Sequence, residues 1–167
     1  NGVLVAAAVL DNAGSIHSLT RERLEHVVGT KVFGSLVMSR VFAERKLDFL
    51  VFSSSMSTQL YHNRFGQVCY VTGNSFVEAV PLSRDWQGTQ VTTVAWDDFL
   101  QYGMSIRAAN AFAERTRHGE VSLMERVHSF TPTQGGIIFE RCVSAGFPQV
   151  YISTTDLAAR IEHDAEV

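Results

Sequence analysis

The chain has 167 residues, of which 46% are hydrophobic and 19% charged, and its net charge is −3. This composition favours one soluble domain with a sizeable core and argues against a nucleic-acid surface. No apolar run approaches the ~20 residues of a membrane span, and no signal-peptide pattern is present, so we expect no membrane partner and a cytoplasmic location. The two cysteines and six histidines show no metal-ligand spacing, so we expect no metal site.

Apolar runs and amphipathic segments alternate in the first third of the chain. Residues 2–10 (GVLVAAAVL) form the continuous apolar run that is typical of a buried parallel strand. Residues 18–45 carry apolar side chains at helical spacing, and Ser18 or Thr20 is suited to cap the helix start. Residues 47–55 (LDFLVFSSS) predict a second buried strand that ends in hydroxyl side chains.

The alternation continues to the end of the chain. A polar loop leads into a helix that carries Tyr70 and Asn74, and residues 89–96 (TQVTTVAW) predict a third strand. Two amphipathic pieces, residues 121–130 and 131–146, precede a last strand at residues 149–154. This order predicts an α/β fold in a single domain, with a parallel sheet covered by helices on both faces.

Three stretches lie at the carboxyl ends of the predicted strands, at residues 7–12, 53–57 and 96–104. In open parallel sheets, ligands bind outside the carboxyl ends of the strands, so these stretches predict a ligand crevice. Tyr70 and Asn74 are four residues apart and project from one face of a helix that starts beside this crevice. Pro81 predicts that this helix ends or kinks by Val80.

Six segments in register resemble the ketoreductase domains of modular polyketide synthases, which belong to the short-chain dehydrogenase/reductase superfamily. The fourth is similar to the family signature GQxxYxxxNxFLDA, and the fifth to INWDxWxxxGM. Together they cover nearly the whole chain, and they read GVLVAAAVLDN, LTRERLEHVVGTKVFGSL, FLVFSSS, GQVCYVTGNSFVEA, VAWDDFLQYGM and QVYISTTDLAARI. The resemblance implies a Rossmann-like, doubly wound sheet of the short-chain dehydrogenase/reductase type.

The resemblance also implies an activity, namely NADPH-dependent reduction of a β-ketoacyl thioester that an acyl carrier protein holds on phosphopantetheine. Tyr70 would protonate the ketone oxygen, and the Lys31 ammonium would stabilise the phenolate that results. Asn74 would hold a water that resupplies the proton. The combination of Lys31 on the preceding helix with asparagine four residues after the tyrosine is the arrangement of polyketide ketoreductases.

The catalytic serine has two candidates. Counting from the strand end selects Ser54, whereas counting thirteen residues back from Tyr70 selects Ser57. We favour Ser54, because strand ends are fixed by pairing while loops absorb insertions. The resemblance further implies cofactor contacts at Ala7, Ala8, Ser53, Trp96 and Asp97, and substrate contacts at Asp11, Ser57 and Met104.

The match departs from the family at two places. Asn12 stands where one stereochemical subtype has aspartate, and we retain a preference for that subtype, which gives the D-configured hydroxyl. No GxGxxG turn follows a strand, and this turn normally cradles the cofactor pyrophosphate. We therefore expect residues 1–167 to be the carboxyl-terminal part of one ketoreductase domain, inactive without the amino-terminal part and working among neighbouring synthase domains.

Two other functions stay open from the sequence. The same domain type occurs in depsipeptide-forming nonribosomal synthetases, where the substrate is an α-ketoacyl thioester. A degenerate ketoreductase kept as a structural domain is the non-enzymatic alternative. The expected residue types at Tyr70, Ser54, Lys31 and Asn74 argue against such decay.

Overall fold

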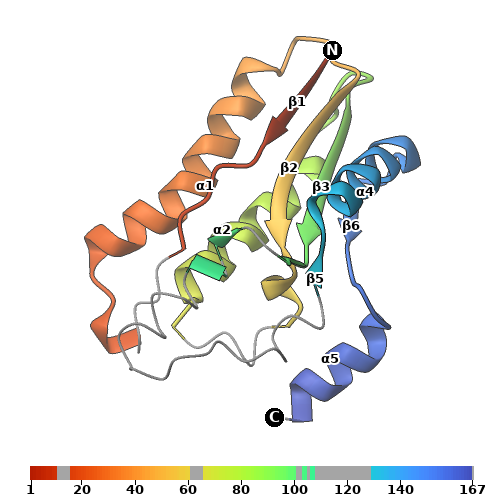
Figure 1. The fold of residues 1–167 in the computed structure, drawn as a ribbon. Coiled ribbons are helices and arrows are strands. Elements are labelled where there is room, and N and C mark those ends of the chain that lie inside the picture. Colours follow the sequence, from red (N-terminus) through yellow and green to blue (C-terminus); the bar gives the residue numbers. More distant parts are fainter. Residues whose placement is uncertain (11–15, 61–65, 101–102, 105, 108–128, 167) are drawn as a thin grey trace.

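The computed structural model describes residues 1–10, 16–60, 66–100, 103–104, 106–107 and 129–166. At its centre is a four-stranded sheet in the order β1-β2-β3-β6, in which all neighbouring strands are parallel (Figure 1). Its strands are β1 (Gly2–Val5), β2 (Phe49–Ser55), β3 (Gln90–Trp96) and β6 (Gln149–Tyr151). The predicted parallel α/β architecture is confirmed.

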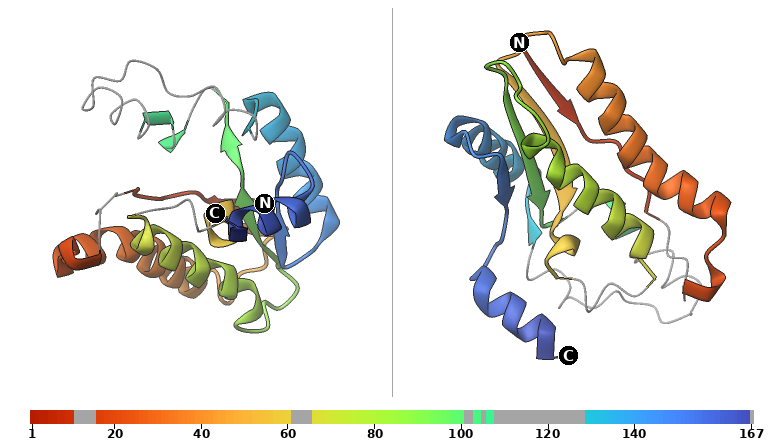
Figure 2. Two further views of the ribbon diagram at one scale, coloured as in Figure 1. Left: turned by 90° about the horizontal axis from the view of Figure 1, so that it is seen from below. Right: turned by 180° about the vertical axis from the view of Figure 1, so that it is seen from behind.

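Helices cover both faces of this sheet (Figure 2). One face carries α1 (Arg21–Val41) and α2 (Val68–Ala79), and the other carries α4 (Pro132–Ala145). The last helix, α5 (Leu157–Glu166), follows β6. The short elements are η1 (Ile16–Ser18), η2 (Met56–Thr58), η3 (Val80–Leu82) and a parallel pair of β4 (Asp98–Phe99) with β5 (Ser129–Phe130).

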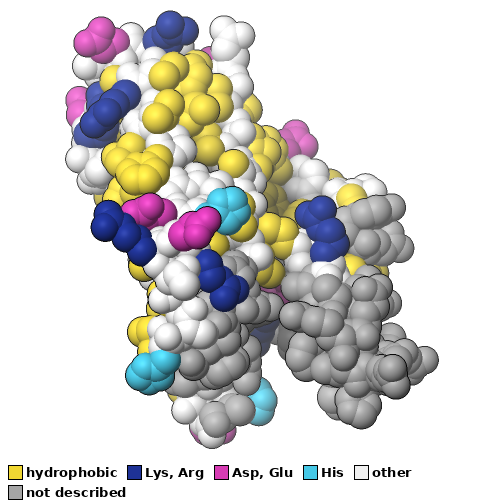
Figure 3. Space-filling model, turned by 90° about the vertical axis from the view of Figure 1, so that its left-hand side faces the viewer, with side chains coloured by type: hydrophobic (Ala, Val, Ile, Leu, Met, Phe, Trp, Pro, Cys, Tyr) yellow, Lys and Arg dark blue, Asp and Glu magenta, His cyan; other side chains and the backbone are white. Residues whose placement is uncertain are grey.

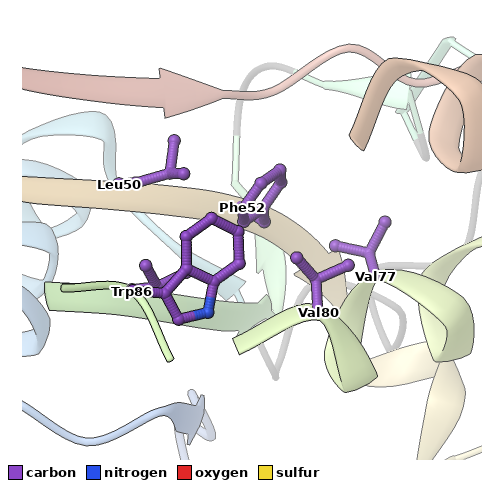
Figure 4. Close-up of a cluster of buried hydrophobic side chains, with 6 residues drawn as sticks. Leu50, Phe52, Val77, Val80 and Trp86 are labelled. Atoms are coloured by element: carbon purple, nitrogen blue, oxygen red, sulfur yellow. The ribbon is translucent and has the colours of Figure 1, made fainter. Parts of the chain in front are cut away.

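The central strand β2 is buried on both faces because its side chains alternate between two cores. Leu50 and Phe52 pack toward α2 in a cluster that also includes Val77, Val80 and Trp86 (Figure 4). Val51 points to the opposite face, where it packs with Val94 of β3 and Cys142 of α4. A strand in this position needs apolar residues at consecutive positions, which is the pattern that predicted it.

The first strand differs from its prediction in length and burial. The apolar run at residues 2–10 forms a strand only over Gly2–Val5, and Leu4 is 49% exposed. Among the described residues β1 pairs with β2 alone, so it has a strand on one side only. A run of apolar residues therefore predicted the strand correctly but not its burial, which depends on neighbours.

Local start and stop signals are confirmed along the chain. The Thr20 hydroxyl accepts a hydrogen bond from the Arg23 amide at 3.2 Å and caps α1. The α2 helix ends at Ala79, directly before the single turn of η3 that contains Pro81. The predicted helix at residues 131–146 is α4, which begins with a capping box formed by Thr131 and Gln134.

The other predicted amphipathic piece lies mainly outside the described residues. Of residues 121–130, only Ser129 and Phe130 are described, and they form β5 rather than part of a helix. Burial of Phe130 explains the apolar end of this segment. The described end of this amphipathic piece is therefore a short strand.

The outer face of α1 exposes several large apolar side chains. Figure 3 shows hydrophobic side chains gathered over the α1 and β1 side of the molecule. Those on α1 are Leu24, Phe33, Leu36, Val37 and Val41. Within the part of the chain that the structure describes, no helix combines the length and apolar character that a membrane crossing requires.

Candidate active site

Lys31 is the most unusual charged residue at the carboxyl edge of the sheet. It lies on α1, is only 7% exposed, and its Nζ donates a hydrogen bond to the carbonyl of Ser53 in β2. Burial lowers the pKa of Lys31 from 10.5 to about 8, because an ammonium group loses hydration in the interior. The structure therefore holds this amine at the end of β2, where its charge can respond to pH near neutrality.

The close crossing of α1 and α2 explains how Lys31 reaches this position. A Cβ added at Gly73 of α2 would lie 3.2 Å from Cβ and 3.3 Å from Cγ of Lys31. Only a residue without a side chain leaves this space to the lysine stem. Gly73 is three residues after Tyr70 and directly before Asn74, so the stem of Lys31 crosses α2 within one turn of both.

Tyr70 and Asn74 occupy successive turns near the start of α2, as the sequence predicts. Tyr70 is half-buried, and the Asn74 Nδ2 donates to the Tyr70 carbonyl at 2.9 Å. Asn74 itself is fully buried, and its Oδ1 has no hydrogen-bond partner among the described residues. A buried acceptor without a partner is costly, so it is a natural place for a bound water or ligand group.

The two candidate serines have different surroundings. The Ser54 hydroxyl donates to Oε1 of Glu78 at 2.6 Å in the protein interior. A hydroxyl has a single proton, so Ser54 cannot donate to a ketone oxygen while it makes this bond. Ser57 lies in η2, is 1% exposed, and its Oγ has no partner among the described residues.

The hydrogen bond to Glu78 places Ser54 about two helical turns from Tyr70 along α2. Ser54 is level with Glu78, which follows Tyr70 by eight residues, or ~12 Å along a helix axis. The helix runs back along the sheet from the carboxyl edge (Figure 1), so Tyr70 lies further toward that edge than Ser54 does. The η2 turn follows β2, and its Thr58 hydroxyl lies 2.8 Å from the same Glu78 oxygen.

The predicted cofactor contacts lie at the carboxyl ends of three neighbouring strands. Ala7 and Ala8 follow β1, and Ser53 lies in β2, where its carbonyl accepts the Lys31 amine. Trp96 ends β3, and its ring packs against Phe99 and Phe130, each at 5.9 Å between ring centroids.

Asp97 has a structural partner that the sequence did not indicate. Its side chain is 1% exposed and pairs with Arg160 of α5, with Nη1–Oδ2 at 2.5 Å and Nη2–Oδ1 at 3.3 Å. The Thr154 hydroxyl lies 3.4 Å from the same carboxylate. This bidentate pair holds α5 against the end of β3, so the Asp97 carboxylate is engaged by protein groups.

Of the other two predicted substrate contacts, Asp11 and Met104, the structure describes only Met104. Asp11 lies outside the described residues, as does Asn12. Met104 is described and half-buried, just after Gly103, whose φ of 121° favours glycine. Across the described ranges, no three His, Cys, Asp or Glu side chains gather as a metal site would require.

Comparison with known proteins identifies the family. The family model described as the KR domain matches residues 1–101, which is more than half of the chain. The chain belongs to the KR (ketoreductase) domain family of polyketide synthases. This confirms the resemblance seen in the sequence motifs, and KR domains are oxidoreductases of the short-chain dehydrogenase/reductase type that generally use a reduced nicotinamide cofactor.

Curated relatives of this KR chain are much longer proteins. It is 29% identical over 167 residues to 6-methylsalicylic acid synthase from Aspergillus terreus, covering 95% of the chain and 9% of the synthase. It is 32% identical over 151 residues to the polyketide synthase GfsB from Streptomyces halstedii, covering 88% of the chain and 2% of GfsB. The chain thus spans less than a tenth of either synthase.

Solved structures agree with this family. The first ketoreductase of the tylosin polyketide synthase superposes with a TM-score of 0.71 at 28% identity, covering 95% of this chain and 33% of that chain. An N-terminal ketoreductase from the macrolactin assembly line gives a TM-score of 0.71 at 25% identity, covering 98% and 30% respectively. The fold is therefore of the ketoreductase type, and this KR chain spans about a third of each solved chain.

Sequence reasoning did not single out three residues that organise this KR site. They are Gly73, which makes room for Lys31, Glu78, which binds Ser54, and Arg160, which pairs with Asp97. The sequence could have indicated a buried role for Glu78, because it is the one acidic residue in an otherwise apolar helix end, VEAV. The partners of the other two come from distant segments, so no local pattern pointed to them.

Proposed function

We propose that this chain carries the catalytic residues of an NADPH-dependent ketoreductase that reduces a carrier-protein-bound β-ketoacyl thioester. One observation carries the proposal. The stem of a buried amine, Lys31, crosses α2 at Gly73, three residues after Tyr70, at the edge of the sheet where Ser57 and Asn74 have polar atoms without a partner among the described residues. An enzyme that protonates a ketone oxygen needs such a donor and such a charge together.

The residues at the ends of β1 and β2 fit a nicotinamide cofactor better than those at the end of β3. Near the end of β2, the amine of Lys31 offers hydrogen-bonding capacity, as do Ser57 Oγ and Asn74 Oδ1, which have no partner in the described ranges, whereas Asp97 at β3 is already paired. Ala7, Ala8 and Ser53 would line the cofactor, which supplies a hydride to the carbonyl carbon. We propose NADPH as its form.

The protein side chains would handle the proton. Tyr70 would donate its phenolic proton to the ketone oxygen, and the positive charge of Lys31 would stabilise the phenolate. We propose Ser57, rather than Ser54, as the hydroxyl that holds the ketone oxygen, because the Ser54 proton is directed to Glu78. Asn74 would bind a water through its free Oδ1 and return a proton to Tyr70.

The surroundings of the chain follow from the same proposal. Because this chain spans a small part of its relatives, we propose that it works within a larger ketoreductase domain, beside neighbouring synthase domains in the cytoplasm. An acyl carrier protein would deliver the substrate on phosphopantetheine, and Met104 and Asp11 would contact it. The D-configured hydroxyl is the product we propose.

The test is substitution of Tyr70 in the full-length protein that contains this chain. We expect Tyr70→Phe to reduce NADPH oxidation with a β-ketoacyl thioester by ~100-fold or more while the protein stays folded. Thr72→Val is the matched control, because it removes an exposed hydroxyl from the same helix. Retained turnover in Tyr70→Phe would remove the phenol from the mechanism.

The choice of substrate is tested in the same assay. The wild-type protein is offered a β-ketoacyl thioester and an α-ketoacyl thioester, each on the carrier. Preference for the α-keto compound would support the depsipeptide alternative. Binding of NADPH without reduction of either compound would support an inactive structural domain.

A further inference from the structure

A second polar cluster lies deeper than the proposed active site and is centred on Glu78. This residue is in α2, two turns beyond Tyr70, and is 8% exposed. Its Oε1 accepts hydrogen bonds from Ser54 at 2.6 Å and from Thr58 at 2.8 Å. Its Oε2 accepts from the Gln149 amide at 3.1 Å and from the Tyr151 hydroxyl at 3.2 Å.

These four donors satisfy the carboxylate without a cation. A carboxylate has about four acceptor positions, and four neutral donors face them here, although the Thr58 hydroxyl also lies 3.1 Å from the Ser55 carbonyl oxygen. Burial and the adjacent negative charge of Glu78 raise the pKa of Tyr151 to about 12. The Tyr151 hydroxyl therefore remains protonated at physiological pH and continues to donate, so the cluster keeps its hydrogen bonds.

The cluster joins segments that are far apart in the chain. Gln149 and Tyr151 belong to β6, whereas Ser54 is the penultimate residue of β2 and Thr58 the last of η2. Ser54 and Thr58 flank Ser57, whose own hydroxyl is unpartnered among the described residues. Glu78 thus holds the chain on both sides of Ser57 and leaves the Ser57 hydroxyl free.

The η2 turn is also anchored by packing, because Met56 is 1% exposed and lies in a buried cluster with Leu60 and Ala95. Its backbone is closed by the amides of Gln59 and Leu60, which both donate to the Met56 carbonyl, at 3.0 and 2.9 Å. The Ser57 amide donates to the Ser55 hydroxyl at 3.2 Å. These bonds shape the turn internally, and the bond from Thr58 to Glu78 ties it to α2, the helix that carries Tyr70.

We infer that Glu78 is a positioning residue for ketone reduction: through Ser54 and Thr58 it sets where the Ser57 hydroxyl lies relative to Tyr70. This inference rests on the proposed function, because it concerns the geometry of the same site. The family signature has aspartate at this position, and the additional methylene of glutamate extends the carboxylate toward the end of β2 and the η2 turn. Glu78 touches neither substrate nor cofactor in this role.

The experiment uses the full-length protein and compares Glu78→Gln with Glu140→Gln, an exposed residue of α4 that undergoes the same change in charge. In Glu78→Gln one acceptor oxygen becomes an N–H donor, so the hydroxyls that face it must turn to accept, and the Gln149 amide, which only donates, cannot do so. We expect kcat to fall about tenfold with the KM for NADPH changed less than about twofold. Glu78→Asp should recover part of the loss.

A double-mutant cycle separates positioning from a general loss of structure. If Glu78 acts through Ser57, Glu78→Gln should cause almost no further loss of kcat when Ser57 is already alanine. Independent, multiplying effects of the two substitutions would overturn the inference, as would an unchanged kcat in folded Glu78→Gln. Should Glu78→Gln fail to fold, Thr58→Val removes a single donor and is expected to lower kcat about threefold.

A second measurement does not depend on activity. Amide hydrogen exchange at Gln59 and Leu60 should be about tenfold faster in Glu78→Gln than in Glu140→Gln, because the η2 turn opens more often. If the wild-type protein reduces no ketone, the proposed function fails. The exchange measurement still tests whether Glu78 holds the η2 turn, because it does not depend on activity. Unchanged exchange at both amides would overturn the positioning role.

Discussion

The carboxyl ends of β2 and β3 are neighbours in the sheet but are organised in opposite ways. At the end of β3, Asp97 is fully paired with Arg160, and Trp96 is packed in an aromatic cluster. At the end of β2, a buried amine has a lowered pKa, and the side chains of Ser57 and Asn74 have polar atoms that no described residue bonds. Satisfied groups stabilise a fold, whereas buried groups that lack partners are available to a ligand.

The largest expected effect comes from Lys31, at the β2 end. Lys31→Met should lower kcat by ~100-fold or more, because the phenolate of Tyr70 loses its stabilising charge. The same variant should have a higher thermal midpoint at pH 7. Burial of the charged amine opposes folding there, since the pKa of Lys31 is lowered to about 8 in the folded protein.

The sign of this pH dependence follows from the lowered pKa. Between about 8 and 10.5 the unfolded chain binds the proton more tightly, so the stability contributed by Lys31 rises with pH across that window. Activity should change in the opposite direction and fall as pH rises through about 8, where the amine loses its charge. Lys31→Arg should move this alkaline limit upward, and a limit that stays near 8 would contradict the assignment.

The next largest effect is expected at the β3 end, and on stability rather than chemistry. Asp97→Asn leaves the Arg160 charge in a poorly solvated position, so the free energy of unfolding should decrease by about 3 kcal/mol. Denaturant unfolding measures this change, and kcat of the folded variant should remain within about twofold of wild type. A large loss of kcat without loss of stability would instead assign Asp97 to the cofactor, as the sequence motif implied.

The two serines offer a sharper comparison within the β2 end. Ser57→Ala should reduce kcat by ~10-fold to 100-fold with little change in stability, because its hydroxyl makes no hydrogen bond to any residue that the structure describes. Ser54→Ala removes a buried bond to Glu78, so it should lower the free energy of unfolding by about 1 kcal/mol and affect kcat less. The reverse order of the two kcat values would restore Ser54 as the catalytic hydroxyl.

The smallest expected effect concerns the helix crossing. A Cβ at Gly73 would lie 3.2 Å from Cβ of Lys31, so Gly73→Ala should displace the lysine slightly and lower kcat a few-fold. Alanine also favours the helix by about 0.5–1 kcal/mol relative to glycine, which offsets the crowding in unfolding measurements. Gly136→Ala in α4 is the control, because that position has open space around it. Equal kcat values for the two variants would show that the crossing does not position Lys31.

Local patterns in the sequence determined a large part of this protein. Alternating apolar runs and helical periodicity gave the strand and helix order, Thr20 marked the start of α1, and Pro81 marked the end of α2. The spacing of Tyr70 and Asn74 in a family signature indicated the ketoreductase family, which the family model confirms. These signals succeed because caps, helix ends and side-chain faces depend on residues only a few positions apart.

Only the tertiary structure decided which polar groups are already engaged. Ser54 and Asp97 were expected at the site from their positions in motifs, yet their partners, Glu78 and Arg160, come from segments 24 and 63 residues away. The lowered pKa of Lys31 likewise depends on the packing of α1 against α2 and β2. Burial and partner choice are properties of the assembled layers, because a side chain loses water only when distant segments close over it.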